Sequence, residues 1–352
     1  MDILISPQIN LLDNSAEIDE NSTFSSMKFF ERDQVRIALG DALSLYQSWD
    51  KPTVIISDGP YGLASYPGDP ASPDNLAECY EPHIKKWSEL ALPSTTIWFW
   101  NTELGWANVH HKFIEHGWEF RNCHIWDKGI GHIAGNSNSK TLRKYPVTTE
   151  VCVQYVKKVF FDVGNKKLSM RDWLRYEWER SGLPFSKTNE ACGMKNAATR
   201  KYFTKDHLWY FPPPEAFEAL AAYANKYGHP RGKPYFSLDG KKSIKAKDWS
   251  LMRAKFFCYN GTTNVWQLPA VRGIERLKEN NQCIHMNQKP MKLIELCLKS
   301  SSEEGDVVWE PFGGLCTGAI ASHKMKRKCF SSEIIKDYYL IAKKRLENYD
   351  VF

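Results

Sequence analysis

Four consecutive residues, Asp58, Gly59, Pro60 and Tyr61, have the types and order needed to hold a planar amine. The Asp58 carboxylate and the Gly59 carbonyl can each accept one N–H bond of an exocyclic amino group, while the ring of Tyr61 stacks on the attached heterocycle. Such a site suits an amino-purine or an amino-pyrimidine. Asp, Gly and Pro are also common residues of ordinary turns, so the tetrapeptide alone leaves both interpretations open.

A second group of residues, far along the chain, predicts a nucleoside-binding turn. Residues 307–318 read Val-Val-Trp-Glu-Pro-Phe-Gly-Gly-Leu-Cys-Thr-Gly, the pattern of a buried strand that runs into a glycine-containing turn. Glycines let a ligand approach the backbone at the carboxyl end of a parallel strand, where open α/β sheets bind nucleosides. Glu333, about twenty residues further on, is placed to accept ribose hydroxyls. The turn lacks Gly-x-Gly-x-x-Gly, which disfavours a nicotinamide cofactor.

The segments that carry these residues alternate between predicted strands and helices. Buried strands are predicted at four short apolar runs, 51–58, 95–100, 306–310 and 329–332. Helices are predicted where apolar residues recur at helical spacing, at 80–92, 288–301, 319–326 and 336–348. This alternation is typical of a Rossmann-like α/β fold with helices on both faces of a mostly parallel sheet. We expect one sheet assembled from two parts of the chain, 30–155 and 260–352.

The residues between these parts, 156–259, differ in charge and in pattern. Residues 155–255 contain 21 Lys and Arg against 10 Asp and Glu, although the net charge of the whole chain is only +6. Such local charge suits a surface that faces phosphates, or a solvated insertion. Helices are predicted at 169–180, 187–192, 196–203 and from 215 onward, with a tight turn at Gly193. This module is similar to a helix-turn-helix, although other small helical bundles share the spacing.

Length and composition exclude several classes of protein. With 352 residues, 42% of them hydrophobic and 25% charged, the chain can bury a core and is not disordered as a whole. No apolar run approaches the roughly 18 residues of a membrane-spanning helix, and no secretion signal is recognised. The nine cysteines include no Cys-x-x-Cys pair, which indicates reduced thiols and no metal site. We therefore expect a cytoplasmic globular protein without a membrane partner.

The same residues, in the same order, resemble the DNA amino-methyltransferases that use S-adenosylmethionine. Asp58-Gly59-Pro60-Tyr61 is similar to the catalytic Asp-Pro-Pro-Tyr motif of that family. Further similarities are Glu310-Pro311-Phe312-Gly313-Gly314 with the cofactor motif Asp-Pro-Phe-x-Gly, Gln288-Lys289-Pro290 with the Gln-Lys-Pro before the cofactor strand, and Gly40-Asp41-Ala42 with the acidic element that meets the adenine of the cofactor. Trp126-Asp127-Lys128 and Glu150 fit strand-end positions. Because the catalytic motif precedes the cofactor motif, the chain resembles the permuted β class, over roughly residues 35–350.

The resemblance implies which residues form the site. Catalysis is assigned to Asp58, Gly59, Pro60 and Tyr61. Binding of S-adenosylmethionine is assigned to Asp41, Ala42, Asp58, Gln288, Lys289, Pro290, Glu310, Pro311, Phe312, Gly313, Gly314, Thr317 and Glu333. The chain departs from the family at three places. Gly59 replaces a proline, which keeps the carbonyl but loosens the loop, Glu310 replaces aspartate, and Leu315-Cys316 stand where Ser-Gly is usual.

The implied reaction explains these residue types. An exocyclic amine is a poor nucleophile because its lone pair is delocalised into the ring. The base would leave the stack and enter the pocket, where Asp58 and Gly59 would localise the lone pair for attack on the methyl group of the cofactor. The sequence has no Pro-Cys loop of the kind used to methylate cytosine carbon 5.

Target recognition is assigned to the basic module. In the helix-turn-helix interpretation, 196–202 is the recognition helix and presents Asn196, Thr199, Arg200 and Lys201 to the major groove of double-stranded DNA. The same residues also suit plain surface positions or phosphate contacts. Residues 128–144, rich in Gly, Asn and Ser, predict a loop that closes over the flipped base, or an inert connection. The resemblance is compatible with a homodimer and with a cognate restriction endonuclease in a prokaryotic or phage system.

The identity of the methylated base is the least constrained expectation. Aspartate at the first motif position usually accompanies adenine N6 targets in the resembling family, and this favours adenine over cytosine N4. Cytosine N4 enzymes usually carry serine there, and Ser57 directly precedes Asp58. A further alternative is a DNA-binding regulator on a decayed methyltransferase scaffold, which the irregular cofactor turn would explain. An RNA or small-molecule methyltransferase fits the motif order less well.

Overall fold

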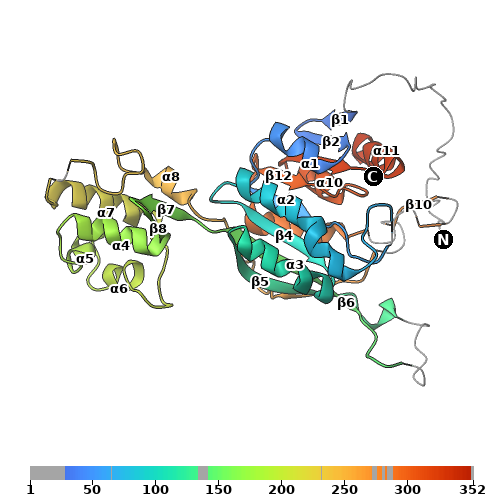
Figure 1. Cartoon of the computed structure of the whole chain (residues 1–352), viewed down its shortest axis with the longest axis horizontal. Coiled ribbons are helices and arrows are strands. Elements are labelled where there is room, and N and C mark those ends of the chain that lie inside the picture. The colour runs from blue at the N-terminus through green and yellow to red at the C-terminus, as the bar shows by residue number, and fades with distance from the viewer. Residues whose placement is uncertain are drawn as a thin grey trace, which may run out of the picture. The chain divides into compact units, whose positions relative to one another are not determined.

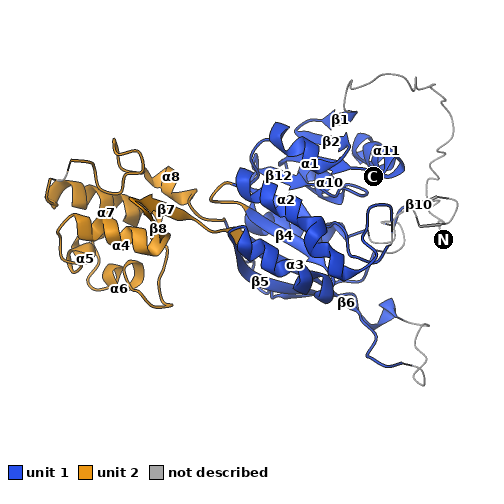
Figure 2. Ribbon diagram, viewed as in Figure 1, with its two compact units in different colours: residues 1–91, 96–155, 255–352 blue, residues 92–95, 156–254 orange. Residues whose placement is uncertain are grey.

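The structure is a computed structural model that describes residues 28–64, 66–133, 142–230, 232–271, 276–279, 282–283 and 288–349. The chain divides into two compact units (Figure 2). Unit 1 takes the described parts of 1–91, 96–155 and 255–352, and unit 2 takes 92–95 and those of 156–254. The larger part of unit 2, 156–254, falls within the range 156–259 that the sequence assigns to a basic module.

Nine strands of the described chain form one sheet (Figure 1). In spatial order they are β1 (Phe29–Arg32), β2 (Val35–Leu39), β13 (Lys328–Glu333), β12 (Val307–Glu310), β3 (Val54–Ser57), β4 (Thr96–Asn101), β6 (Thr149–Lys157), β5 (Trp118–Asp127) and β9 (Val265–Gln267). Strands β2, β13, β12, β3 and β4 run parallel, so their carboxyl ends meet at one edge. The sheet joins both parts of the chain as predicted, and β12 lies directly beside β3.

Helices cover both faces of this sheet because side chains alternate along each strand. On β3, Ile55 packs in one hydrophobic cluster, and Val54 and Ile56 pack in the other. The first cluster contains residues of α1 (Ala42–Leu45), α2 (Leu76–Leu90) and α3 (Glu103–Glu115). The second contains residues of α9 (Met291–Ser301), α10 (Thr317–Lys324) and α11 (Lys336–Glu347). The Rossmann-like α/β fold predicted from the sequence is confirmed.

The smaller elements of the chain add little to the site. A two-stranded pair is formed by β10 (Lys278–Glu279) and β11 (Gln282–Cys283). Short 3-10 turns occur at Tyr46–Ser48, Pro73–Asn75 and Ile130–His132. Among the described residues, no helix is both long enough and apolar enough to cross a membrane.

Unit 2 contains a hairpin and several short helices around an aromatic core. The hairpin is β7 (Phe160–Val163) with β8 (Lys166–Ser169), and the described helices are α4 (Met170–Arg180), α5 (Lys187–Ala191), α6 (Ala198–Tyr202), α7 (Pro214–Tyr227) and α8 (Ala246–Ser250). In the core, the ring of Trp249 stacks on Phe217 with centroids 4.0 Å apart. The predicted helices at 169–180, 187–192 and 196–203 are present, the last two being shorter, whereas the hairpin was not predicted.

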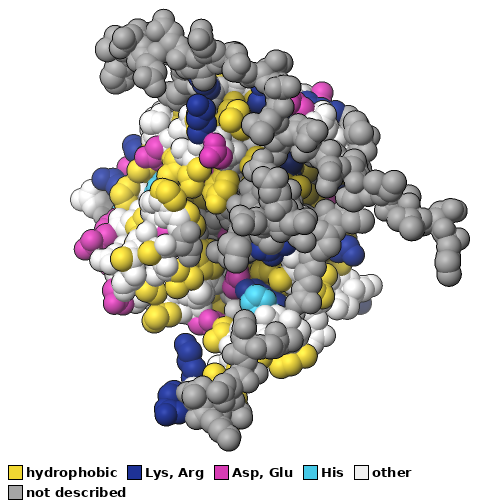
Figure 3. All heavy atoms as spheres, turned by 90° about the vertical axis from the view of Figure 1, so that its right-hand side faces the viewer, with side chains coloured by type: hydrophobic (Ala, Val, Ile, Leu, Met, Phe, Trp, Pro, Cys, Tyr) yellow, Lys and Arg dark blue, Asp and Glu magenta, His cyan; other side chains and the backbone are white. Residues whose placement is uncertain are grey.

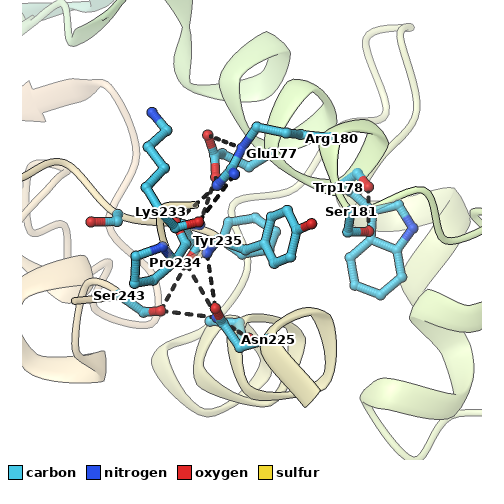
Figure 4. Close-up of polar contacts among 12 residues, drawn as sticks. Glu177, Trp178, Arg180, Ser181, Asn225, Lys233, Pro234, Tyr235 and Ser243 are labelled. Carbon is cyan, nitrogen blue, oxygen red and sulfur yellow. Dashed lines mark hydrogen bonds and ion pairs between the residues drawn. The ribbon is translucent and has the colours of Figure 1, made fainter. Parts of the chain in front are cut away.

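A buried ion pair fastens the segment after α7 to α4 (Figure 4). Glu177 Oε2 and Arg180 Nη2 lie 2.6 Å apart, and the two side chains are 1% and 10% exposed. Arg180 also donates hydrogen bonds to the carbonyl groups of Lys233 and Pro234, at 3.2 and 2.8 Å. The guanidinium is thus committed to contacts inside unit 2, so Arg180 is not one of the cations that this unit offers to a partner.

Candidate active site

The predicted motifs meet at the carboxyl edge of the sheet. Asp58 follows β3, Glu310 ends β12 and Glu333 ends β13, and these three strands are parallel neighbours. Asp41 follows β2, the next strand in the sheet. This edge lies on the right in Figure 1, and Figure 3 faces it, with hydrophobic side chains gathered among acidic and basic ones. Residues more than two hundred positions apart in sequence are thus brought to one place.

The loop that carries the predicted catalytic motif, residues 58–63, is held through its backbone, and it is called the catalytic loop below. The carbonyl oxygen of Pro60 accepts hydrogen bonds from the Tyr80 hydroxyl at 3.0 Å and from Asn101 Nδ2 at 2.9 Å. The Asp69 carboxylate accepts three backbone N–H bonds, from Tyr61 at 2.9 Å, Gly62 at 2.7 Å and Leu63 at 3.1 Å. Because these donors and acceptors lie on separate elements, the path of the loop is fixed independently of any ligand.

Lys289 places a buried cation against the catalytic motif. Its side chain is 2% exposed, and Nζ donates to Asp58 Oδ1 at 2.7 Å and to the Tyr61 hydroxyl at 2.9 Å. The Tyr61 hydroxyl lies 3.1 Å from the same oxygen, Asp58 Oδ1. Within the described chain we find no donor to the second oxygen, Oδ2, and the Asp58 side chain is 23% exposed. One oxygen of the carboxylate is therefore anchored, and the other is available to a ligand.

Glu150 and Lys128 complete this charge cluster, which comprises Asp58, Tyr61, Lys128, Glu150 and Lys289. Glu150, the second residue of β6, has its Oε2 atom 3.0 Å from the Tyr61 hydroxyl and 3.2 Å from Lys289 Nζ. Its other oxygen accepts a hydrogen bond from Lys128, which follows β5. The cluster holds two lysines and two carboxylates, so the buried charges compensate one another.

The protonation states of the cluster follow from burial and from the neighbouring charges. Burial alone would lower the pKa of Lys289, but attraction to Asp58 and Glu150 outweighs it and raises that pKa above its usual value. Burial likewise works to raise the pKa of Glu150, yet the two lysines lower it. Burial raises the pKa of Tyr61 well above its ordinary range. At neutral pH, Lys289 is therefore cationic, Glu150 is ionised and Tyr61 keeps its proton.

Gly59 joins the catalytic loop to the cofactor motif. A Cβ atom at this position would lie 2.5 Å from Phe312 Cδ2 and 2.7 Å from the Tyr80 hydroxyl. Phe312 itself packs against the rings of Tyr80 and His83, with centroids 5.6 and 4.8 Å away. The sequence analysis expects this glycine to loosen the loop, whereas in the structure the lack of a side chain permits close packing on Phe312.

Gly59→Ala is expected to disturb both halves of the site. The added methyl group must displace Phe312 or Tyr80, and overpacking of this kind lowers the free energy of unfolding by about 1 to 3 kcal/mol. Urea denaturation measures this loss, and single-turnover methylation would fall with it. The double variant Gly59→Ala/Phe312→Ala serves as the control, because the penalty should shrink once the ring is gone. Unchanged stability of the single variant would show that the loop accommodates the methyl group.

Glu310 supports the turn between β12 and α10, residues 311–316, which is called the cofactor turn because the sequence assigns it to the cofactor. Its carboxylate, 5% exposed, accepts hydrogen bonds from the backbone N–H groups of Gly318 and Ala319 at 2.5 and 3.0 Å and from the Ser331 hydroxyl at 2.7 Å. These contacts hold the first turn of α10 against β13. Burial raises the pKa of Glu310 to about 7. The side chain that the sequence assigns to the cofactor is thus occupied by its own chain.

The irregular part of the turn has a strained backbone. Cys316 has φ +53°, in the left-handed region that favours glycine, and glycine is the usual residue of the resembling family at this position. Such a conformation costs a non-glycine residue on the order of 1 kcal/mol. Gly313 has no room for a side chain, because a Cβ would lie 2.8 Å from Cys316 Sγ and 2.9 Å from Ser331 Oγ. The turn is closely packed despite its departure from the family pattern.

The acidic residues at the ends of β2 and β13 lie beside this turn. Glu333 Oε2 accepts the N–H of Gly314 at 2.6 Å, and Oε1 accepts that of Ile335 at 2.7 Å. The backbone N–H of Gly40 donates to the Glu333 carbonyl at 2.9 Å, which brings Asp41 close to Glu333. Asp41 caps α1 by accepting the N–H of Leu43 at 2.9 Å.

The remaining residues assigned to the cofactor have mixed positions. Gln288 is buried and its Oε1 atom lies 3.4 Å from the backbone nitrogen of Leu277, while Pro290 precedes α9 as its N-cap. The carbonyl of Pro311 accepts a hydrogen bond from Ser332 at 3.0 Å. Ala42 and Thr317 are buried at the starts of α1 and α10. Their contacts to a cofactor stay a prediction. Lys289 differs from them, because its amine lies among the residues assigned to catalysis.

In unit 2, three of the four predicted DNA-contacting residues are exposed. Asn196, Arg200 and Lys201 lie at the surface on or beside α6, and Arg200 Nε donates to the Asn196 carbonyl at 3.1 Å. Thr199 differs from the prediction, because its hydroxyl bonds the Phe185 carbonyl at 2.9 Å and the Thr188 hydroxyl at 2.7 Å inside the unit. Of the loop predicted at 128–144, residues 134–141 lie outside the described residues.

Sequence analysis missed several residues that shape the site. Asp69, Tyr80 and Asn101 hold the catalytic loop, but nothing near them in sequence marks that role. For Lys128 and Glu150 the sequence predicts strand-end positions but no function. A charged residue directly before or after a predicted buried strand was the available signal, since such positions gather at the edge of the sheet.

Comparisons with known proteins agree with this geometry. Residues 53–344 match the family described as DNA methylase (N6_N4_Mtase). The orphan methyltransferase M.BamHII of Bacillus amyloliquefaciens is 30% identical over 159 residues, which cover 43% of this chain and 56% of that protein. The DNA adenine methyltransferase YhdJ of Escherichia coli (strain K12) is 34% identical over 84 residues, 24% of this chain and 27% of that protein. This chain spans about half the length of the relatives it matches. The matched residues cover 56% of M.BamHII and 53% of a second relative, the type II methyltransferase M.ScaI of Streptomyces caespitosus.

Two solved structures also align with the chain. The M1.HpyAVI–SAM complex aligns over 88% of this chain and 98% of that chain, with 16% identity and a TM-score of 0.46. The PvuII DNA methyltransferase, described as cytosine-N4-specific, aligns over 89% of each chain with 11% identity and a TM-score of 0.46. The match of residues 53–344, most of the sequence, shows that this chain belongs to the DNA methylase family.

Proposed function

We propose that this protein transfers a methyl group from S-adenosylmethionine to the exocyclic amine of a base in double-stranded DNA, with adenine N6 as the favoured target. The observation that carries the proposal is the half-anchored Asp58 carboxylate. Its Oδ1 atom is held by Lys289 at 2.7 Å, and it stands at the end of the strand beside the cofactor motif. Membership of the DNA methylase family supports the same reaction.

The described residues fit S-adenosylmethionine by their chemistry. Glu333 and Asp41 offer carboxylates for ribose hydroxyls and for the adenine amine, and Phe312 offers an aromatic ring. An added Cβ at Gly40, which precedes Asp41 and bonds the Glu333 carbonyl through its N–H, would meet no atom within 4 Å, so space lies open at this position. When bound, the cofactor supplies an electrophilic methyl group on a sulfonium.

The protein's own part in the reaction is to hold and polarise the amine. Asp58 Oδ2 and the Gly59 carbonyl accept its two N–H bonds, and the ring of Tyr61 stacks on the base. These hydrogen bonds draw the two protons toward their acceptors and return electron density to the nitrogen, which becomes the nucleophile. One of the two protons passes to Asp58 Oδ2 as the nitrogen takes the methyl group, and the other stays on the nitrogen. Acceptors that are already oriented need no reorganisation when charge develops, and this is the usual source of electrostatic catalysis.

Mass spectrometry of nucleosides tests the proposal. DNA is incubated with the purified protein and S-adenosylmethionine and then digested, and we expect N6-methyladenine. Adenine is favoured by the aspartate of the motif, and the relative from Escherichia coli is named a DNA adenine methyltransferase. N4-methylcytosine alone would establish the second candidate. No methylated nucleoside, together with no cofactor binding in calorimetry, would favour a DNA-binding regulator.

Phe312→Ala is expected to weaken binding of S-adenosylmethionine by about tenfold. The ring lies beside the turn that follows β12, and an aromatic contact contributes on the order of 1 kcal/mol beyond the area it buries. Isothermal titration calorimetry measures the change, with Phe312→Tyr as the control that keeps the ring. Equal affinities of Phe312→Ala and the wild type would mean that the motif does not contact the cofactor.

Arg200→Ala is expected to relax the sequence preference of DNA binding. If the exposed guanidinium reaches a guanine edge, its loss costs about 1 to 3 kcal/mol at the specific site and little elsewhere. Fluorescence anisotropy on specific and unrelated duplexes compares the two losses. Arg200→Lys keeps the charge but not the paired donors, so it should also lose preference. Equal weakening on all duplexes would instead assign Arg200 to phosphate contacts.

Partners and location belong to the same proposal. Double-stranded DNA is the partner that the family implies. A homodimer, a cognate restriction endonuclease and a cytoplasmic location are further expectations from the sequence. Light scattering of the purified protein, with and without DNA, measures its oligomeric state.

A further inference from the structure

The charge cluster is assembled from four separate parts of the chain: the catalytic loop, the residue after β5, the start of β6 and the segment before α9. We propose that Glu150 and Lys289 are positioning residues that fix Asp58 Oδ1 and the Tyr61 hydroxyl, and thereby leave Asp58 Oδ2 to accept the target amine. This inference rests on the proposed methyl transfer.

The contacts of Lys289 determine its orientation completely. A lysine ammonium group has three N–H donors. Three oxygens surround Nζ, namely Asp58 Oδ1 at 2.7 Å, the Tyr61 hydroxyl at 2.9 Å and Glu150 Oε2 at 3.2 Å. With a side chain only 2% exposed, Lys289 is shielded from solvent. The ammonium group therefore fixes the relative positions of an aspartate, a tyrosine and a glutamate.

Glu150 holds the cluster from β6, an element separate from the catalytic loop. Its Oε2 atom contacts both Lys289 and Tyr61, and its Oε1 atom accepts from Lys128. Lys128 in turn lies over the ring of Trp126, with Nζ 5.0 Å from the centroid. Glu150 is thus fixed by its own neighbours, and it can keep Lys289 and Tyr61 in place when a base enters.

The contacts of Lys289 distinguish the proposed role, positioning Asp58, from the role that the sequence assigns to it, binding the cofactor. The donors of Nζ point to the catalytic loop and to β6, and its nearest aromatic ring is that of Tyr61, with the centroid at 5.1 Å. A residue that acts through Asp58 changes the rate of methyl transfer from the assembled complex. A residue that binds the cofactor changes the affinity for it.

The test uses Glu150→Gln, which keeps the size of the side chain but removes its charge. We expect single-turnover methylation from a preformed complex with DNA and S-adenosylmethionine to slow by about 10- to 100-fold, because small misplacements of reacting groups have effects of that order. Dissociation constants for both ligands should stay within about twofold. The matched control is Glu103→Gln, an exposed carboxylate that also contacts β6, through the Thr149 hydroxyl at 2.6 Å, and it should react like the wild type.

A double-mutant cycle shows whether the two residues act together. Lys289→Met should slow transfer like Glu150→Gln, and the double variant should lose less than the product of the two single effects. Lys289→Arg, which keeps the charge, should recover part of the rate. If thermal melting shows that Lys289→Met does not fold, Glu150→Gln and its control still decide the question.

Two results would overturn the inference. One is a wild-type rate in Glu150→Gln. The other is a Lys289→Met variant that binds S-adenosylmethionine more weakly yet transfers methyl groups at the normal rate once the complex is formed. The wild type is measured alongside the variants. A wild-type protein that methylates no DNA would refute the proposed function itself. Variants that match an active wild type would refute only the positioning role of Glu150 and Lys289.

Discussion

Asp58→Ala is expected to lower the rate of methyl transfer by about 10² to 10³ while binding of S-adenosylmethionine stays nearly unchanged. In the proposed reaction this carboxylate accepts an N–H of the target amine, whereas the cofactor motif follows a different strand, β12. The structure adds a second cause, because Lys289 and Tyr61 lose the oxygen that they share at 2.7 and 3.1 Å. Single-turnover kinetics measures the rate, and calorimetry measures cofactor binding.

The companion variant for this prediction is Asp58→Asn. It keeps the shape and one acceptor oxygen but removes the charge that pairs with Lys289, so its rate should fall between those of Asp58→Ala and the wild type. Thermal melting of both variants checks that the buried lysine has not unfolded the loop. Near-normal turnover of Asp58→Ala would remove Asp58 from the mechanism.

Glu310→Ala is expected to reduce the free energy of unfolding by about 3 kcal/mol, since three donors would lose their acceptor at roughly 1 kcal/mol each. These donors are the backbone N–H groups of Gly318 and Ala319 and the Ser331 hydroxyl. The start of α10 and the cofactor turn would then lose their support, so cofactor binding should fall as well. Urea denaturation gives the first value and calorimetry the second. A stable variant that binds poorly would instead point to direct contact between Glu310 and the cofactor.

The pH dependence of stability provides a check on this residue. Burial raises the pKa of Glu310 from 4.5 to about 7, so the folded protein binds this proton more tightly than the unfolded chain does. The contribution of Glu310 to stability is therefore complete below about pH 4.5 and is lost as the pH rises through about 7. In Glu310→Gln no such loss is expected, and a stability difference between the two proteins that is flat over this range would contradict the assignment.

Prediction from the sequence succeeded at four strands that are buried on both faces, β3, β4, β12 and β13, whereas β6 is buried to a similar degree and was not predicted. The runs at β3 and β12 are almost entirely apolar because helices cover both sides of them, and this makes the strand and its carboxyl end visible in the sequence. The segment that became β5 has exposed residues at Glu119, Phe120, Arg121 and Asn122, so it shows no continuous apolar run. Motif residues at the ends of buried strands were therefore placed correctly at one edge.

What the sequence could not provide is the meeting of residues from different strands. Glu150 and Lys289 are neighbours only because β6 and the segment before α9 reach the same edge, and no local pattern encodes that contact. The hairpin of unit 2 is different, since Gly164-Asn165, the two residues between β7 and β8, is a recognised turn pattern and Gly164 has φ +58°. The turn pattern that predicts this hairpin is therefore visible in the sequence, although the sequence analysis does not use it.

The contacts that join β1 and β2 to β13 and α11 bear on how the order of the motifs can vary. β2 and β13 pair in parallel, and Arg32, at the end of β1, donates hydrogen bonds to the carbonyl groups of Leu346 and Glu347 in α11. A backbone that was joined at this place and opened between the two motifs would present the cofactor motif before the catalytic one, with every contact at the carboxyl edge unchanged. The order of the two motifs along the sequence therefore depends on where the chain is joined and where it is opened. The arrangement of the motif residues at the carboxyl edge does not depend on that order.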